Sequence, residues 1–213
     1  FSSCYINVYR IKIYNATKIE LQLIHKTRVF DTPLALCEYK GKLLCGVGKV
    51  LRLYDIGKKT LLKKCEYKNF GSVINNIKVS KNGSRIFVTD MSSGFYYVTY
   101  RENNKQFFIF ADNPVPQRIV AFDELDYDTL CAGDLFGNIN IVRYISDDTD
   151  YTVNDLSKHN DNNLIISSTA HNKKEYLGGA PKKLVDIVSF FVGETITCIK
   201  KCKLNYINPT SKE

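Results

Sequence analysis

The glycines before Lys49 form the most suggestive chemical motif in the chain, because Gly46-Val47-Gly48-Lys49 resembles part of a phosphate-binding loop. Such a loop needs four residues between its first glycine and the Gly-Lys pair, then Ser or Thr, then a helix. Here Leu43 occupies the first glycine position and Val50 follows the lysine. The residues after Val50 alternate like a strand. The motif therefore predicts a hairpin turn and not a phosphate site.

An acidic run is the next candidate for chemistry, since carboxylates can bind calcium or act in acid–base pairs. A calcium loop needs oxygen ligands at alternate positions, then a glycine and a closing glutamate. Leu125 and Tyr127 occupy positions where oxygens would be required. The run therefore predicts a solvated loop, formed by Asp123, Glu124, Asp126 and Asp128.

The histidines and cysteines do not form a pattern that indicates a metal or catalytic site. His25, His159 and His171 are scattered, and Cys198 and Cys202 lack a second ligand pair. No serine-hydrolase elbow of the form Gly-x-Ser-x-Gly occurs. We therefore predict that the chain is not an enzyme and holds no metal or cofactor. We expect His25, at a strand end, to be exposed or hydrogen-bonded.

The seven cysteines predict a reducing compartment. Their number is odd, their spacing is irregular, and five of them lie within apolar, strand-like runs. Free cysteines of this kind behave as small buried hydrophobes, which favours the cytosol or the nucleus. No run approaches the roughly 18 apolar residues of a membrane span, so we expect no membrane contact. Because the sequence starts at Phe1 without a signal region, we expect a fragment with no targeting segment of its own.

The charge of +8 and the pI near 9.0 invite a nucleic-acid interpretation. Lysines cluster around one hairpin, and this cluster is the candidate interaction rim: Lys58, Lys59, Lys63 and Lys64. Strand alternation places Lys63 and Lys64 on opposite faces, which argues against a single basic groove. We expect a solvated rim that blunts sheet edges, and phosphate contact is the alternative.

Short strand-like segments recur along the chain and form an internal repeat. Each unit has an apolar strand, a turn rich in Gly, Ser, Asp or Lys, and a second strand that ends in Tyr. The turns begin at Gly48, Asp90 and Asp134, so the steps are 42 and 44 residues. The paired strands are Leu43–Gly48 with Val50–Tyr54, Ile86–Asp90 with Phe95–Tyr100, and Leu130–Asp134 with Asn138–Tyr144.

A period near 40–45 with about four strands per unit is typical of β-propeller blades. Asn7-Val8-Tyr9 fits one further step towards the N-terminus, which brings the visible total to about four blades. The predicted fold is therefore all-β, a partial and open β-propeller of WD-repeat-like architecture, although the WD and kelch signatures are absent. A β-sandwich is the alternative, and the regular period argues against it.

The predicted organisation has four parts. Propeller blades occupy residues 1–145, and a long polar insertion, largely disordered, occupies residues 146–181. Further propeller strands follow in residues 182–207, with order expected at 183–191 and 195–202. Residues 208–213 form a frayed tail.

Several stretches of the repeats resemble the splicing factor 3b subunit 3 family. The first is Val47–Lys59, followed by Phe110-Ala111-Asp112, Asp126–Thr129 and Gly133–Asn138. Val192–Thr195 is similar to a short motif shared with two related scaffolds, the large subunit of the cleavage and polyadenylation factor and the damaged-DNA-binding adaptor of cullin ubiquitin ligases. The resemblance covers roughly residues 20 to 200, and the Lys/Asn-rich insertion departs from it.

This resemblance implies a segment of the third, seven-bladed propeller of a nuclear scaffold. The family belongs to the U2 small nuclear ribonucleoprotein, where it supports branch-site recognition in pre-mRNA splicing. The implied partners are other splicing factor 3b subunits: the helical-repeat subunit and small subunits. The alternatives are direct RNA binding, or a role as a cullin adaptor or polyadenylation paralogue. Since open blade edges recruit strands, we also expect copies of the fragment to self-associate.

Overall fold

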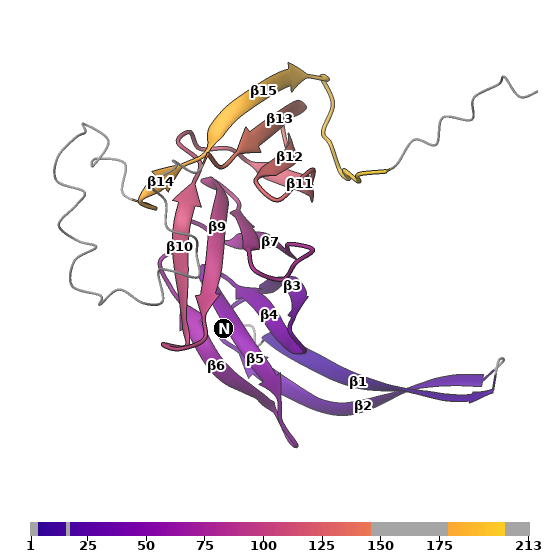
Figure 1. The fold of residues 1–213 in the computed structure, drawn as a ribbon. Helices are drawn as coiled ribbons and strands as arrows, with labels where there is room; N and C mark the ends of the chain where they lie inside the picture. The colour runs from indigo at the N-terminus through magenta and orange to yellow at the C-terminus, as the bar shows by residue number, and fades with distance from the viewer. Residues whose placement is uncertain (1–3, 16–17, 146–178, 203–213) are drawn as a thin grey trace, which may run out of the picture.

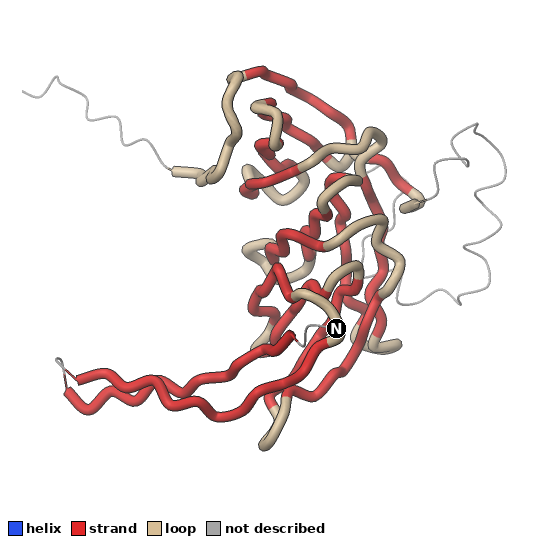
Figure 2. The backbone as a smooth tube through the Cα atoms, turned by 180° about the vertical axis from the view of Figure 1, so that it is seen from behind, coloured by secondary structure: helices blue, strands red, loops and turns tan. Residues whose placement is uncertain are grey.

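The structure, a computed structural model, describes residues 4–15, 18–145 and 179–202. These residues form strands and no helix, as Figure 2 shows. Most strands follow one another at short intervals, as the period-two alternation predicts. Their bounds are β1 Cys4–Asn15, β2 Lys18–Val29, β3 Pro33–Tyr39, β4 Lys42–Val47, β5 Val50–Ile56, β6 Leu61–Tyr67, β7 Ile74–Val79, β8 Ile86–Asp90, β9 Gly94–Arg101, β10 Gln106–Asp112, β11 Ile119–Glu124, β12 Thr129–Asp134, β13 Asn138–Arg143, β14 Lys182–Lys183 and β15 Val185–Phe191.

Three antiparallel sheets have the order of propeller blades, in which successive strands run from the inner to the outer edge. We call them blade 1 (β3-β4-β5-β6), blade 2 (β7-β8-β9-β10) and blade 3 (β11-β12-β13-β15). The short strand β14 adds to blade 2 in parallel with β10. The blades follow one another in chain order (Figure 1). The predicted open, partial β-propeller is confirmed.

The turns that defined the sequence repeat join the second and third strands of each blade. Gly48, Gly94 and Gly137 lie in these turns with φ of 55°, 100° and 90°, a region that favours glycine. In blades 2 and 3 an aspartate closes the turn. Asp90 Oδ1 accepts the backbone N–H of Ser92 at 3.0 Å, and Asp134 Oδ1 accepts that of Phe136 at 2.9 Å. A glycine with positive φ is therefore common to all three connections, and the aspartate closure is shared by blades 2 and 3.

Two hydrophobic layers hold the blades together. In blade 2 the neighbouring residues Val88 and Phe87 point to opposite sides of β8. Val88 belongs to the core shared with blade 1, which includes Leu44, and Phe87 belongs to the core shared with blade 3, which includes Leu130. Each blade therefore buries both faces when it lies between two neighbours.

The first unit of the repeat is a two-stranded hairpin, β1–β2, which we call the arm. The repeat predicted a further blade at Asn7-Val8-Tyr9, whereas the structure has two strands there. Only the base of the arm packs on the body, where Ile6 and Val29 share a core with Val47 of blade 1. The rest extends away from the blades (Figure 1).

From residue 179 the described chain is bound to blade 2. Asp112, the last residue of β10, anchors it by accepting the backbone N–H of Ala180 at 3.0 Å and by pairing with Lys183 Nζ at 2.5 Å. β15 then pairs with β13 and completes blade 3. Residues 146–178 and 203–213, which include most of the predicted insertion and the predicted tail, lie outside the described residues.

All seven cysteines are free thiols, as the sequence predicts. Cys45 and Cys65 are buried within blade 1. A search of the described residues for helices with the length and apolarity of a membrane span found none.

Candidate functional site

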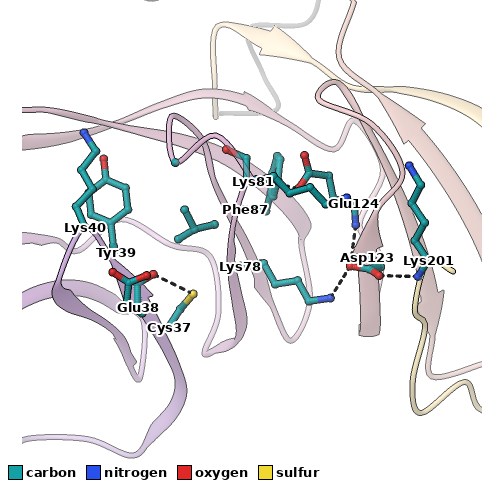
Figure 3. A pocket seen from close by; sticks show the side chains of 13 residues that line it. Cys37, Glu38, Tyr39, Lys40, Lys78, Lys81, Phe87, Asp123, Glu124 and Lys201 are labelled. Carbon is teal, nitrogen blue, oxygen red and sulfur yellow. Dashed lines mark hydrogen bonds and ion pairs between the residues drawn. The ribbon is translucent and has the colours of Figure 1, made fainter. Parts of the chain in front are cut away.

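A pocket of about 560 Å³ lies between the three blades, at the C-terminal ends of their first strands β3, β7 and β11. The first strands of all three blades reach it at their ends, together with turn residues of blades 1 and 2, and Figure 3 shows side chains around the hollow. The lining residues are Cys37, Glu38, Tyr39 and Lys40 from blade 1, Lys78, Val79, Ser80, Lys81, Gly83 and Phe87 from blade 2, Asp123 and Glu124 from blade 3, and Lys201.

The local sequence explains why these turns are tight. Lys40 and Gly41 have φ of 49° and 74°, and Glu38 Oε1 accepts the backbone N–H of Gly41 at 2.6 Å. In blade 2, Gly83 has φ of 71° and its N–H donates to the carbonyl of Ser80 at 2.8 Å. The turns therefore hold the lining residues in fixed positions.

Asp123 is the electrostatic centre of the pocket. It accepts hydrogen bonds from Lys78 Nζ at 3.1 Å and from the backbone N–H of Lys201 at 2.8 Å. Partial burial acts to raise the pKa of Asp123, but these hydrogen bonds outweigh it and hold the pKa below its usual value. The carboxylate is therefore ionised at neutral pH and joins blade 2, blade 3 and the segment after β15.

The other acidic side chains of the pocket are also engaged by backbone groups. Glu124 Oε2 accepts the backbone N–H of Lys81 at 3.2 Å, and Glu38 Oε1 accepts that of Gly41. The lining residue Lys40 pairs through its Nζ with Glu102, 2.8 Å away. The Lys81 ammonium has no carboxylate partner within the described ranges. A cation is therefore the group that this pocket leaves available for a partner.

The thiol and the possible metal ligands near the pocket can be described individually. Burial raises the pKa of the Cys37 thiol, so the thiol stays protonated at neutral pH and is a poor nucleophile. Across residues 4–15, 18–145 and 179–202, no group of three metal-ligating side chains comes together. The arrangement can bind and orient a partner through hydrogen bonds and charge.

The predicted basic rim divides into two parts, and none of its lysines lines the pocket. Lys63 Nζ lies 3.0 Å from Glu66, and Lys64 Nζ lies 3.6 Å from Asp55. Lys58 and Lys59 lie exposed in the turn between β5 and β6, without a carboxylate partner among the described residues. Two of the four lysines are therefore engaged in ion pairs, and the interaction rim stays a prediction.

The sequence predicted that the acidic run is a solvated loop. In the structure its carboxylates also form ion pairs with lysine and arginine side chains. Asp128 pairs with Arg85 at 2.6 Å, Asp126 with Arg143 at 3.6 Å, and Asp123 with Lys78. The sequence could not show this, since Lys78 and Arg85 lie some forty residues earlier in the chain.

The expectation for His25 was wrong. Its side chain lies at the base of the arm, 7% exposed, and neither ring nitrogen has a hydrogen-bond partner among the described residues. β2 continues to Val29, four residues beyond the predicted strand end, so His25 lies within the strand and not at its end. His159 and His171 lie outside the described residues.

Comparison with known proteins identifies the group to which the chain is related. The family described as "CPSF A subunit region" matches residues 2–213. Spliceosome-associated protein 130 A of Arabidopsis thaliana is 40% identical over 184 residues, which cover 86% of this chain and 14% of the relative. Splicing factor 3B subunit 3 of Danio rerio is 38% identical over 200 residues, covering 94% and 15%.

A fungal relative gives the same result. Pre-mRNA-splicing factor RSE1 of Mycosarcoma maydis is 37% identical over 182 residues, which are 85% of this chain and 14% of the relative. The chain spans about one seventh of the length of the curated relatives it matches. The matches and the stacked β blades agree: the chain belongs to the CPSF A subunit region family, in the group that includes splicing factor 3B subunit 3.

Proposed function

We propose that this chain is a non-catalytic scaffold module of the splicing factor 3b complex in the nuclear U2 small nuclear ribonucleoprotein. In this role it supports branch-site recognition in pre-mRNA splicing through contacts with other protein subunits. The names of three relatives support a splicing role: spliceosome-associated protein, splicing factor and pre-mRNA-splicing factor. Residues 182–207 continue the propeller in this proposal.

One observation carries the proposal of protein contact. The first-strand ends of three blades converge on one pocket, whose carboxylates are bound internally, while Lys81 has no carboxylate partner among the described residues. Apolar and polar lining groups that surround an available cation suit an acidic loop or side chain of a protein partner. Rigid turns limit the entropy that such binding would cost.

A pull-down from nuclear extract tests the proposal. The tagged chain is expected to recover the helical-repeat subunit of splicing factor 3b, detected by immunoblot. Reversing the available charge, Lys81→Glu, should reduce the recovery at least about tenfold through repulsion of an acidic partner. The matched control is Lys105→Glu, which makes the same charge change at an exposed turn outside the pocket. Equal recovery with both variants would remove the pocket from the proposal.

Direct RNA binding is the second candidate, and Lys58 and Lys59 favour it because neither has a carboxylate partner in the described part of the chain. If these lysines contact phosphates, log affinity for single-stranded RNA should fall with log salt by about 0.7 per contact. Replacing both with alanine should flatten the slope by about 1.4. An unchanged slope would exclude them. Cullin co-purification tests the adaptor alternative.

A further inference from the structure

The turns and connections at one end of blades 2 and 3 lie on the opposite side of the blades from the pocket. The register places Asp90 opposite Ile74, the first residue of β7, and Asp134 opposite Ile119, the first residue of β11. The turns that follow these two aspartates therefore lie at the N-terminal ends of the first strands, whereas the pocket lies at their C-terminal ends.

Hydrogen bonds join these segments into one row. The backbone N–H of Asn113 donates to the carbonyl of Phe95 at 3.1 Å, which ties the β10–β11 connection to the β8–β9 hairpin of blade 2. The backbone N–H of Leu135 donates to the carbonyl of Arg118 at 2.9 Å, which ties the same connection to the β12–β13 turn of blade 3. Asn113 Nδ2 also donates to Gln117 Oε1 at 3.1 Å and closes the connection on itself. The row therefore crosses the joint between blades 2 and 3.

Large apolar side chains project from each segment of the row. We call this surface the turn face; it consists of Met91 from the β8–β9 turn, Val115 from the β10–β11 connection, and Leu135 and Phe136 from the β12–β13 turn. These four side chains are between 43% and 62% exposed. A neighbouring blade covers the face of a sheet and not the turns at the ends of its strands, so their exposure does not depend on how many blades the protein has. Apolar side chains gathered on one exposed surface are typical of a protein-binding site.

The carboxylates beside the turn face are used within the molecule. An aspartate precedes each of the three segments, and all three are buried: Asp90, Asp112 and Asp134. Asp90 accepts the backbone N–H groups of Ser72, Ser92 and Ser93, Asp112 that of Ala180, and Asp134 those of Phe136 and Asn138. These charges are therefore engaged by turn backbone and are not presented to a partner.

Arg118 supplies the charge of the row. Residues 91–93, 113–118 and 135–137 contain this one charged side chain. It is exposed, and it has no carboxylate partner among the residues that the structure describes. The hydrogen bond from Leu135 to its carbonyl holds it between Val115 and the β12–β13 turn. The turn face is therefore an apolar surface with a single available cation.

We propose that the turn face binds an apolar segment of a protein partner that carries a carboxylate opposite Arg118. Its composition suits a protein contact, because Phe, Met and Arg are enriched at protein interfaces whereas Lys, Glu and Asp are depleted. A guanidinium can hold a carboxylate by two parallel hydrogen bonds, which would fix the register of the partner. The site is separate from the pocket around Lys81, so the chain could hold two protein segments at opposite ends of its strands.

RNA fits this surface less well. Met91, Val115 and Leu135 offer no aromatic plane on which bases could stack, and stacking platforms are the usual means of binding single strands. A single cation also gives little attraction to a chain of phosphates.

Fluorescence anisotropy with defined peptides tests the proposal. The probe is a fluorescein-labelled peptide of sequence Ser-Leu-Phe-Glu-Leu-Phe-Ser, and two further peptides replace its Glu with Lys or its Leu and Phe with Ser. The parent chain should bind the first peptide at least about tenfold more tightly than either of the others, since only the first offers both the apolar contacts and the charge.

Two variants of the turn face should respond differently. Val115→Ser with Phe136→Ser should weaken binding of the Glu peptide at least about tenfold, because apolar contacts are lost. Arg118→Glu should weaken the Glu peptide by a similar factor and should tighten the Lys peptide, because the charge pair is restored in reverse. The matched controls are Leu62→Ser, an exposed leucine of β6, and Lys105→Glu, in the turn between β9 and β10. Both should bind like the parent.

Three outcomes would overturn the turn face as a protein-binding site. The parent could fail to bind the Glu peptide at concentrations up to about 1 mM. The turn-face variants could bind as the parent does, or Arg118→Glu could fail to gain affinity for the Lys peptide. A labelled uridine oligomer could bind the parent more tightly than the peptide and lose that binding in both variants, which would assign the face to RNA. Thermal unfolding at the parent temperature shows that each variant is folded. Failure of Lys81→Glu to reduce the pull-down would concern the pocket alone.

Discussion

Arg85 of blade 2 places its guanidinium Nη1 2.6 Å from Oδ1 of Asp128, in the first turn of blade 3. The same nitrogen donates to the backbone carbonyl of Tyr127 at 2.7 Å, and the guanidinium lies 3.7 Å from the centre of the Tyr127 ring. The Arg85 side chain is only 6% exposed. One buried cation therefore joins two blades by charge, hydrogen bonding and stacking, beside the hydrophobic core that they share.

Removing the carboxylate should weaken this joint. We expect Asp128→Asn to lower the free energy of unfolding by about 2 kcal/mol, because a buried cation loses its counter-ion; the partial exposure of Asp128 keeps the loss below that of a fully buried pair. Urea unfolding measures it. The control is Lys40→Gln, which breaks the solvent-exposed pair with Glu102 and should cost much less, because solvent screens that pair. Equal losses would show that the Arg85 contact is no stronger than a surface pair.

Glu66 predicts a pH dependence of stability. Its pKa is lowered to about 2, chiefly by the hydrogen bond from Lys63 and further by Lys68. Since the folded pKa lies below the unfolded value, the stabilisation is complete above about pH 4.5 and is lost as the pH falls towards 2. Urea unfolding at pH 6 and pH 3 measures the effect. Between these two pH values the free energy of unfolding of Glu66→Gln should fall by about 1 kcal/mol less than that of the parent. Parallel losses would contradict the shift.

The sequence predicted the middle strands of each blade well. β5 begins at Val50, where the repeat placed it, and the turns at Asp90 and Asp134 fall where the repeat begins them. These strands bury apolar residues at both blade interfaces, so they leave a strong pattern. The turn aspartates accept hydrogen bonds from backbone N–H groups two residues later, so the sequence alone could predict them.

The first strands of the blades and the pocket were harder to predict from the sequence, for a physical reason. β7 carries Asn75, Asn76 and Lys78, which donate to backbone carbonyls of β11 in the next blade. Polar residues in those positions weaken the hydrophobic pattern of a strand. Their partners lie about forty-four residues away, so only the stacked blades bring them together. The same distance hid the pairing of the acidic run with Lys78 and Arg85.

Gly46 should tolerate no side chain. A Cβ there would lie 2.5 Å from Cγ2 and 2.8 Å from Cβ of Ile74, so the interface between blades 1 and 2 would have to open. We expect Gly46→Ala to lower the free energy of unfolding by about 1–3 kcal/mol through overpacking. Thermal and urea unfolding measure the loss. Val79→Ile adds one methylene to a partly buried residue at the edge of the same core and should cost less; a neutral Gly46→Ala would mean that the blades can separate freely.

His25 and Thr27 lie on the same face of the arm but should respond in opposite directions. His25 is buried with both ring nitrogens unpartnered among the described residues, whereas Thr27 Oγ1 accepts the backbone N–H of Leu61 at 2.8 Å. His25→Leu removes unsatisfied polar groups and should raise the free energy of unfolding by about 1 kcal/mol. Thr27→Val leaves the Leu61 N–H without its acceptor and should lower it by about 1–2 kcal/mol. Hydrogen exchange at Leu61 should accelerate only in Thr27→Val. If His25→Leu destabilises the chain instead, the imidazole must bind a group that its buried surroundings do not reveal, and the arm is then held to blade 1 by a polar contact as well as by its apolar base.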